Sequence, residues 1–224
     1  NFIYTIFIDS KDRVWFGTDG KGISVLQNGE ITNYNEAKLS NASDTSTVVF
    51  KTIYAICEDR TGNIWFSTAK QGVFQFNNHY FERLPQKEAV QDKVVTSMKK
   101  DQNNNILLVH PQGIESLEPD SKHLIYYDVE VGLKDIDPNL NAITSDGIST
   151  IWIADQSQLI KYTSLEETLE IHPRTILTDL KVNYKSLQFE KSEKLAHDQN
   201  NIVFHYTGLW YTAPKKVKYK YRLK

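Results

Sequence analysis

The side chains best placed to do chemistry in this 224-residue chain are four aspartates that recur at similar spacing. Alternating carboxylate and amide oxygens can bind calcium, and the segment Asp101–Asn105 begins in that way. It lacks the glycine at position six and the late glutamate of an EF-hand loop. The pattern therefore favours hairpin turns fixed by aspartate hydrogen bonds, and we expect no metal. Each aspartate precedes a bulky apolar residue by six positions, in the pairs Asp9/Trp15, Asp59/Trp65, Asp101/Leu107 and Asp146/Trp152.

Signatures of catalysis are missing from the sequence. The six histidines have no metal-ligand spacing, and no Gly-x-Ser-x-Gly nucleophile motif occurs. Glu166 and Glu167 are neighbours in a predicted loop, whereas acid/base carboxylates must face each other across a cleft. We expect no enzyme activity and no cofactor in this chain.

The three repeat tryptophans could serve as platforms on which sugars stack. Their position between apolar neighbours instead predicts a structural core, together with the aspartates, made of Trp15, Trp65, Trp152, Asp9, Asp59, Asp101 and Asp146. Ligand contacts are expected in loops, where polar side chains can bind hydroxyl groups; plain solvation is the alternative. The candidates lie in the short loops between the second and third strands of each repeat: Asp19, Lys21, Lys70, Gln71, His110 and Gln112. These loops should share a face of the protein with the longer loops 35–52, 86–93 and 128–139.

The elements that position these residues follow from an internal repeat. Segments 3–26 and 53–76 are nearly superimposable, and the four aspartates lie 50, 42 and 45 residues apart. Such periods fit either paired helices or propeller blades. Short runs of β-branched and aromatic residues between Asp/Asn/Gly/Lys clusters indicate strands. Residues 1–172 are thus predicted to form about four β-propeller blades. Four blades are near the lower limit for a closed propeller, so we expect a fragment of a larger protein.

Each blade is predicted to be a four-stranded antiparallel sheet, with strands A to D from the inner to the outer edge. Repeats three and four differ from the others, because Leu107 replaces the tryptophan and the fourth repeat has no glycine between strands B and C. The ranges are 3–8, 53–58, 94–99 and 140–144 for A; 14–17, 64–68, 106–109 and 150–154 for B; 23–26, 73–76, 114–117 and 159–162 for C; and 31–34, 80–84, 124–127 and 169–172 for D.

Composition limits the partners. The net charge of −2 and the absence of a basic stripe argue against nucleic acid. The single cysteine, Cys57, cannot form an intrachain disulfide and is expected to be a buried, inert thiol. No run of 18 apolar residues occurs, so a membrane contact would require a segment outside this sequence.

Residues 173–224 are predicted to be the first strands of an immunoglobulin-like β-sandwich. Pro173 ends the repeat, and the segments after it alternate apolar and polar residues as antiparallel strands do. A complete sandwich needs about seven strands, so we expect a truncated domain. Its expected core residues are Trp210, Tyr211, Tyr219 and Tyr221.

The repeat resembles the two-component regulator propeller repeat. The match is best from Ile53 to Val73, and the first repeat has Asp12 in place of the turn glycine. The C-terminal segment resembles the tyrosine-rich sandwich domain that follows such propellers, through Trp210-Tyr211-x-x-Pro214 and residues 219–223.

This resemblance implies the periplasmic sensor region of a Bacteroidetes hybrid histidine kinase anchored in the inner membrane. Such a region detects an oligosaccharide and relays the signal across the membrane to control transcription, with a homodimer expected and the kinase and membrane span in missing parts. The alternative is a propeller segment that binds no small ligand and acts as a scaffold for protein interaction or dimerisation. A third possibility, a propeller lyase or hydrolase, would need an acid/base set on one loop face, and the sequence offers none.

Overall fold

The computed structural model describes residues 2–39, 46–85, 94–127, 133, 136–164, 174–186 and 196–209. Within these ranges every regular element is a strand, which confirms the prediction of an all-β protein. The described part of the chain therefore holds no helix that could cross a membrane. The chain divides into two compact units, residues 1–166 and 167–224.

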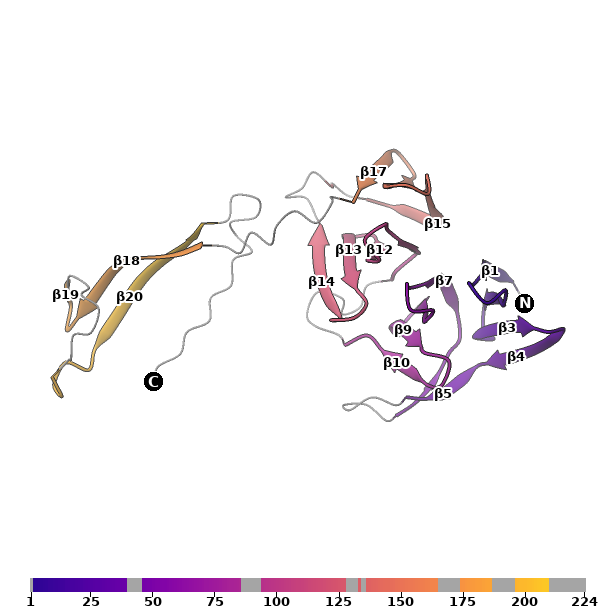
Figure 1. Cartoon of the computed structure of the whole chain (residues 1–224), viewed down its shortest axis with the longest axis horizontal. Coiled ribbons are helices and arrows are strands. Elements are labelled where there is room, and N and C mark those ends of the chain that lie inside the picture. Colours follow the sequence, from indigo (N-terminus) through magenta and orange to yellow (C-terminus); the bar gives the residue numbers. More distant parts are fainter. Residues whose placement is uncertain are drawn as a thin grey trace. The chain divides into compact units, whose positions relative to one another are not determined.

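The first unit is a fan of antiparallel sheets that follow one another along the chain, as propeller blades do (Figure 1). Strands pair in sequence order within each sheet. Blade 1 contains β1 (Ile3–Ile8), β2 (Val14–Thr18), β3 (Ile23–Gln27) and β4 (Glu30–Tyr34); blade 2 contains β7 (Ile53–Glu58), β8 (Ile64–Thr68), β9 (Gly72–Phe76) and β10 (Phe81–Arg83); blade 3 contains β11 (Ser97–Lys100), β12 (Ile106–His110), β13 (Gly113–Glu118) and β14 (His123–Tyr127); blade 4 contains β15 (Pro138–Ser145), β16 (Thr150–Asp155) and β17 (Leu159–Thr163).

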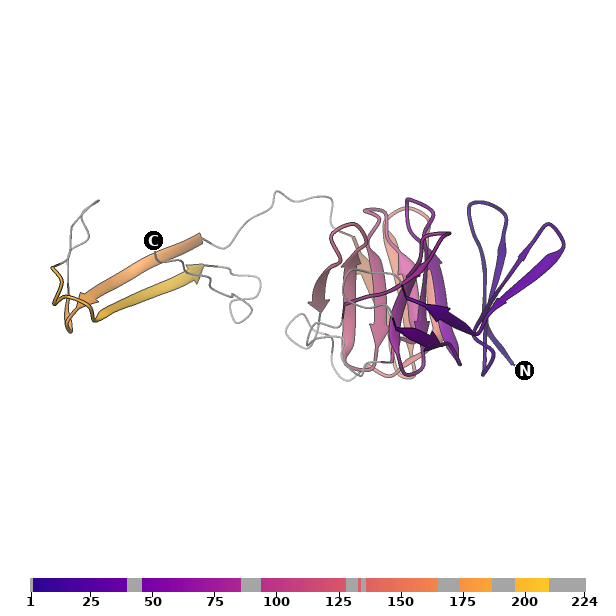
Figure 2. The ribbon, with the colours of Figure 1, turned by 90° about the horizontal axis from the view of Figure 1, so that it is seen from below.

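The first strands of the blades face one another. β1 contacts β7, and β11 contacts both β7 and β15. Seen from the side in Figure 2, the strands run between two faces that carry the turns. Each blade therefore places its A–B and C–D turns on one face and its B–C turn, with the connection to the next blade, on the other. We call the latter the B–C face.

The predicted strand ranges agree closely with those observed, except that β11 starts three residues later than expected. The predicted strand 169–172 lies outside the described residues. The segment 35–52, predicted as a loop, contains a small hairpin of β5 (Glu36–Lys38) and β6 (Thr47–Val49). Strands of three residues carry too little pattern to be recognised, but here Leu39 and Val48 are buried in the core and hold the hairpin in place.

Aromatic side chains dominate the core between blades 1 and 2. Phe50 lies with its ring centroid 5.0 Å from that of Phe74 and 5.2 Å from that of Phe66. Trp15 meets Phe76 edge-on at 5.8 Å. These contacts fix the angle between the two blades, because edge-to-face rings have preferred geometries.

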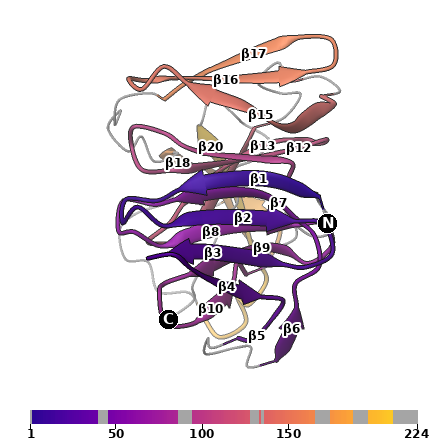
Figure 3. The same cartoon turned by 90° about the vertical axis from the view of Figure 1, so that its right-hand side faces the viewer.

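Blade 1 leaves its outer face open, as the view in Figure 3 shows with β1 to β4 in front. Ile6, Ile8 and Ile31 on this sheet are 61%, 64% and 68% exposed. Ile6 pairs with Phe16 as Ile56 pairs with Phe66, yet Ile56 is buried against blade 1. The exposed face of blade 1 thus corresponds to the face by which blade 2 packs on its predecessor.

The second unit, considered by itself, contains β18 (Arg174–Val182), β19 (Lys185–Ser186) and β20 (Ile202–Leu209) in the order β19-β18-β20. All pairs are antiparallel, and Leu180 and Val182 are buried. Antiparallel strands were expected in this region from its alternating apolar and polar residues. The four expected core residues Trp210, Tyr211, Tyr219 and Tyr221 lie outside the described residues.

Candidate functional site

Each repeated aspartate directly follows the first strand of its blade and holds the next turn. The Oδ1 atom of Asp59 accepts the backbone N–H groups of Thr61 (2.9 Å) and Asn63 (3.0 Å). Its Oδ2 atom accepts the indole N–H of Trp65 at 2.8 Å. Trp65 pairs with Cys57 across the hairpin, which brings the indole beside the aspartate. The aspartate and the tryptophan six residues later are thus hydrogen-bond partners. The sequence analysis did not predict this contact.

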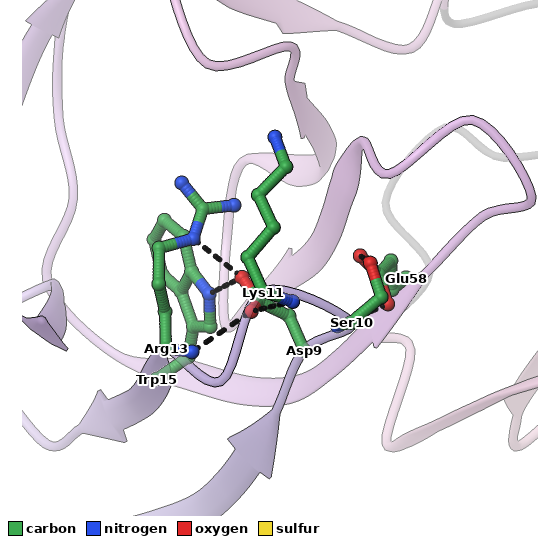
Figure 4. A network of polar contacts seen from close by, with 6 residues as sticks. All are labelled: Asp9, Ser10, Lys11, Arg13, Trp15 and Glu58. Atoms are coloured by element: carbon green, nitrogen blue, oxygen red, sulfur yellow. Dashed lines mark hydrogen bonds and ion pairs between the residues drawn. The ribbon is translucent and has the colours of Figure 1, made fainter.

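Blade 1 repeats this arrangement and adds a cation (Figure 4). Asp9 accepts the indole N–H of Trp15 at 2.8 Å and the Nε–H of Arg13 at 2.6 Å. The Arg13 guanidinium also lies 5.0 Å from the centre of the Trp15 ring. Ser10 of the same turn donates its hydroxyl to Glu58 of blade 2 at 2.6 Å, so the turn also links neighbouring blades.

The later blades depart from this pattern. In blade 3, where Leu107 stands in place of tryptophan, Asp101 Oδ2 accepts the hydroxyl of Ser164 from blade 4 at 3.0 Å. In blade 4, Asp146 holds its turn by accepting the backbone N–H of Thr150 at 3.0 Å. Trp152 differs from its expected buried state, since it is only partly buried and has Lys161 Nζ 5.7 Å from its ring centre. Trp15 and Trp65 are fully buried.

These turns make the fold sensitive to acid. Burial alone would raise the pKa of Asp59, but the hydrogen bonds from Trp65, Thr61 and Asn63 outweigh it and hold that pKa below its ordinary value. The pKa of Asp9 is lowered against burial in the same way. Carboxylates with a lowered folded-state pKa stabilise the fold above the unfolded pKa, near about 4, and this contribution is lost as the pH falls through the folded pKa.

We therefore expect the free energy of unfolding to change little from pH 7 to about pH 5 and to fall below about pH 4. Urea denaturation at several pH values measures this. Asp59→Asn, which cannot ionise, should reduce the steepness of the fall. An unchanged pH dependence in that variant would show that the Asp59 carboxylate does not contribute.

On the B–C face, a threonine at the end of the second strand fixes each turn in blades 1 and 2. The Thr68 hydroxyl donates to the Gly72 carbonyl and accepts the Gln71 backbone N–H, both at 2.9 Å. Thr18 makes the same two contacts in blade 1. Because the main chain is held in this way, the side chains between Thr68 and Gly72 project from a defined turn.

Histidine and aspartate take over this task in blades 3 and 4. His110 Nδ1 accepts the Gln112 backbone N–H at 3.2 Å, and the side chain is fully buried. His110, expected as a ligand candidate in a B–C loop, instead ends strand β12 and supports the turn from inside. Asp155 accepts the backbone N–H of Ser157 at 2.7 Å, and its pKa is lowered by such backbone hydrogen bonds.

The B–C turn of blade 2 and the segment entering β7 enclose a cavity of about 300 Å³. One hydrogen bond joins its walls, from the Ala69 N–H to the Thr52 carbonyl at 3.0 Å. The Thr52 hydroxyl donates to Asp19 of blade 1, outside the lining, at 3.0 Å. The lining residues are Val49, Lys51, Thr52, Thr68, Ala69, Lys70 and Gln71.

Some of the residues that the sequence analysis expected to contact a ligand lie at this cavity. Lys70 and Gln71 line the cavity, and Asp19 borders it through Thr52. Lys21 lies exposed in the neighbouring turn, whose Gly22 N–H donates to the Lys51 carbonyl at 2.9 Å. Exposed Gln112 belongs to the turn of blade 3. Lys51 and Thr52 were expected only as members of a long loop, because nothing in the sequence showed that this segment returns to the turn of blade 2.

The residues that the structure describes contain no group of three or more His, Cys, Asp or Glu able to hold a metal ion. Cys57 is buried, as expected, and burial raises the pKa of its thiol. With two exposed lysines, a glutamine and hydroxyl groups, the B–C cavity offers hydrogen-bond donors and positive charge. Its chemistry suits binding of a hydroxyl-rich or anionic ligand.

Comparison with known proteins identifies relatives of this arrangement. Residues 1–20 and 48–70 match the two component regulator propeller family, over the A strands, aspartate turns and B strands of blades 1 and 2. Histidine kinase P4 of Formosa agariphila is 27% identical over 192 residues, which cover 84% of this chain and 14% of that protein.

Solved structures share the fold. The extracellular domain assigned to a hybrid two component system of B. thetaiotaomicron superimposes with a TM-score of 0.61 at 19% identity, covering 96% of this chain and 30% of that domain. PorZ, a surface component of the type-IX secretion system of Porphyromonas gingivalis, gives a TM-score of 0.52 at 14% identity, covering 95% of this chain and 34% of PorZ. The chain thus spans about a third or less of the length of each of these three proteins.

Proposed function

We propose that this chain is a ligand-sensing part of a hybrid two-component sensor histidine kinase, located in the periplasm and joined to the inner membrane through another part of a longer protein. It detects an oligosaccharide on the B–C face and relays binding across the membrane to control transcription. The kinase chemistry resides outside this chain, which has no catalytic role of its own.

The observation that carries this proposal is the fixed turn beside the 300 Å³ cavity. Thr68 holds the main chain of the turn, so Lys70 and Gln71 can contact a ligand without ordering a loop first. Preorganisation of this kind lowers the entropic cost of binding. The similarity to extracellular domains of two-component systems and to a histidine kinase supports a sensory role.

A double substitution at the cavity tests the proposal. Lys70→Ala with Gln71→Ala removes side-chain donors but keeps the backbone N–H that Thr68 accepts. Each lost hydrogen bond to a ligand is worth about 0.5–1.5 kcal/mol, or more where charge is involved. We expect affinity for the bound oligosaccharide to fall about tenfold or more, measured by calorimetry against neutral and uronic-acid oligosaccharides.

The matched control is Gln112→Ala, which alters the exposed side chain of the equivalent turn in blade 3. It should leave affinity unchanged, and all variants should unfold at the temperature of the wild type. If the double variant binds as tightly as the wild type, the B–C cavity is not the ligand site.

A scaffold role is the second candidate, and the open face of blade 1 favours it. Ile6, Ile8 and Ile31 present exposed apolar side chains that another surface could cover. In this role the chain would bind no small ligand and would act by dimerisation or protein contact. Sedimentation equilibrium together with the calorimetry above distinguishes the two roles. A scaffold built on this face would associate without binding any oligosaccharide, and Ile6→Lys would return it to monomers.

We further propose that the second unit begins a tyrosine-rich sandwich and that residues 1–172 end a larger propeller. The buried pair Leu180 and Val182 supports the first statement, since one face of the sheet already carries apolar side chains. The open face of blade 1 supports the second, because a preceding blade would cover it. A homodimer would then transmit the signal through this second unit.

A further inference from the structure

The interface between blades 3 and 4 lacks the tryptophan that fills the two interfaces before it. Leu107 occupies the strand position of Trp15 and Trp65 and pairs with Ser116, whereas Trp65 pairs with the larger Gln75. Both positions on this face of blade 3 therefore carry smaller side chains. On the same face lies a cavity of about 410 Å³ to which Ser116 contributes.

Blade 1 shows what occupies the equivalent space. The indole of Trp15 lies under the Arg13 guanidinium, against the Phe76 ring of the next blade and on the Asp9 carboxylate. Asn105 is the counterpart of Arg13, because its backbone N–H donates to Asp101 Oδ1 just as that of Arg13 donates to Asp9.

Tyr162 is the counterpart of Phe76. It pairs with Ile151, the residue before Trp152, as Phe76 pairs with Ile64, the residue before Trp65. Both counterparts of the indole's neighbours, Asn105 and Tyr162, line the cavity between blades 3 and 4. Two of the residues that would surround a tryptophan ring in this blade therefore line the cavity.

The acceptor for an indole N–H is also in place. Asp101 Oδ2 corresponds to the oxygen that accepts the indole in blades 1 and 2. In blade 3, where no indole is present, Asp101 Oδ2 accepts the Ser164 hydroxyl at 3.0 Å and the Tyr162 hydroxyl at a long 3.4 Å. The second of these bonds is weak by its length, so a better placed N–H donor could replace it.

We propose that this cavity binds a planar bicyclic aromatic molecule that carries a ring N–H, with indole as the simplest example. The ring would lie against Tyr127 and Tyr162, whose own rings meet edge-on at 6.1 Å, and against the apolar side chains of Ile114, Ile125 and Ile160. Its N–H would point toward Asp101, which contacts the cavity through the lining residues Tyr162 and Ser164. Cavities left by a missing large apolar side chain bind aromatic molecules in other proteins. The volume lies within the usual range for small-molecule sites.

This site is separate from the B–C cavity and does not depend on the proposed sensing of oligosaccharides there. It joins side chains of two blades, from β13 and β14 of blade 3 and β17 of blade 4. Binding would therefore stabilise the contact between them, and the melting temperature should rise with indole concentration.

The test uses indole as the probe on the whole chain, with binding followed by ligand-observed NMR and calorimetry. Wild-type protein should bind indole saturably. Leu107→Trp supplies the missing ring from within and should weaken binding at least tenfold. Ile125→Trp obstructs the cavity from the exposed strand β14 and should do the same, so the test stands even where Leu107→Trp does not fold.

Two controls make the result specific. Lys70→Ala, in the B–C cavity, should leave indole binding unchanged. N-methylindole, which keeps the ring but has no N–H, should bind several-fold more weakly than indole. The proposal is overturned if the wild type shows no saturable binding, or if folded Leu107→Trp and Ile125→Trp proteins bind as the wild type does. Equal binding of N-methylindole would overturn the role given to Asp101.

Discussion

Replacing Trp65 by alanine is expected to lower the free energy of unfolding by about 3–5 kcal/mol, the range for a fully buried aromatic side chain. The Trp65 side chain has no exposed surface and belongs to the core between blades 2 and 3. Its indole N–H satisfies Asp59, and Lys122 Nζ lies 4.3 Å from its ring centre. The substitution thus removes packing, a hydrogen bond and a cation–π contact together.

Urea denaturation of three variants separates these terms. Trp65→Phe keeps much of the ring but leaves Asp59 Oδ2 without the indole donor, so it should cost less than alanine, about 1–3 kcal/mol. Trp152→Ala is the matched control, since Trp152 is only partly buried, and it should cost least. A stable Trp65→Ala protein that had lost ligand binding would instead identify Trp65 as a contact residue.

The fold could be predicted from the sequence because the residues that form the turns and strands of a blade recur in each repeat. Asp59 marks a turn within its own hairpin, and Ile64-Trp65-Phe66 marks a strand buried on both faces. Such signals lie within about ten residues of each other, so they can be recognised without knowing the tertiary structure. The hairpin of β5 and β6 was missed because its place depends on distant core contacts of Leu39 and Val48.

The candidate sites were predictable only in part, because they too depend on contacts between residues distant in the sequence. Lys70 and Gln71 follow a recognisable strand end, whereas Lys51 reaches their cavity through contacts made after folding. His110 was expected as a ligand candidate because a polar residue near a turn usually faces solvent, while here its ring nitrogen takes the role of the Thr68 hydroxyl. The bond from Ser164 to Asp101 spans 63 residues and has no local signal.

The second large effect is expected at Gly22, in the B–C turn of blade 1. Its φ is +71°, a left-handed conformation that costs other residues about 1–2 kcal/mol. A Cβ atom there would collide with the Tyr34 carbonyl oxygen and lie 2.9 Å from Asn35 Cα, both of them backbone atoms that cannot rotate away. Overpacking of this kind destabilises a fold by about 1–3 kcal/mol. Together the two effects should lower the free energy of unfolding of Gly22→Ala by about 2–5 kcal/mol.

Gly20→Ala, two residues earlier, separates the two causes. Gly20 has a similar φ of +83°, but nothing lies within 4 Å of a Cβ placed there. Gly20→Ala should lower the free energy of unfolding only by the cost of the left-handed conformation, about 1–2 kcal/mol, as measured by urea denaturation. Equal losses in the two variants would mean that the backbone around Gly22 yields and that the close approach has no structural importance.

The same pair of variants tests how the B–C cavity is held. The Gly22 N–H donates to the Lys51 carbonyl, so a displaced turn in blade 1 would shift a wall of the cavity in blade 2. Gly22→Ala should therefore weaken ligand binding under conditions in which the protein remains folded, whereas Gly20→Ala should not. Unchanged binding in folded Gly22→Ala protein would show that Lys51 is positioned by blade 2 alone.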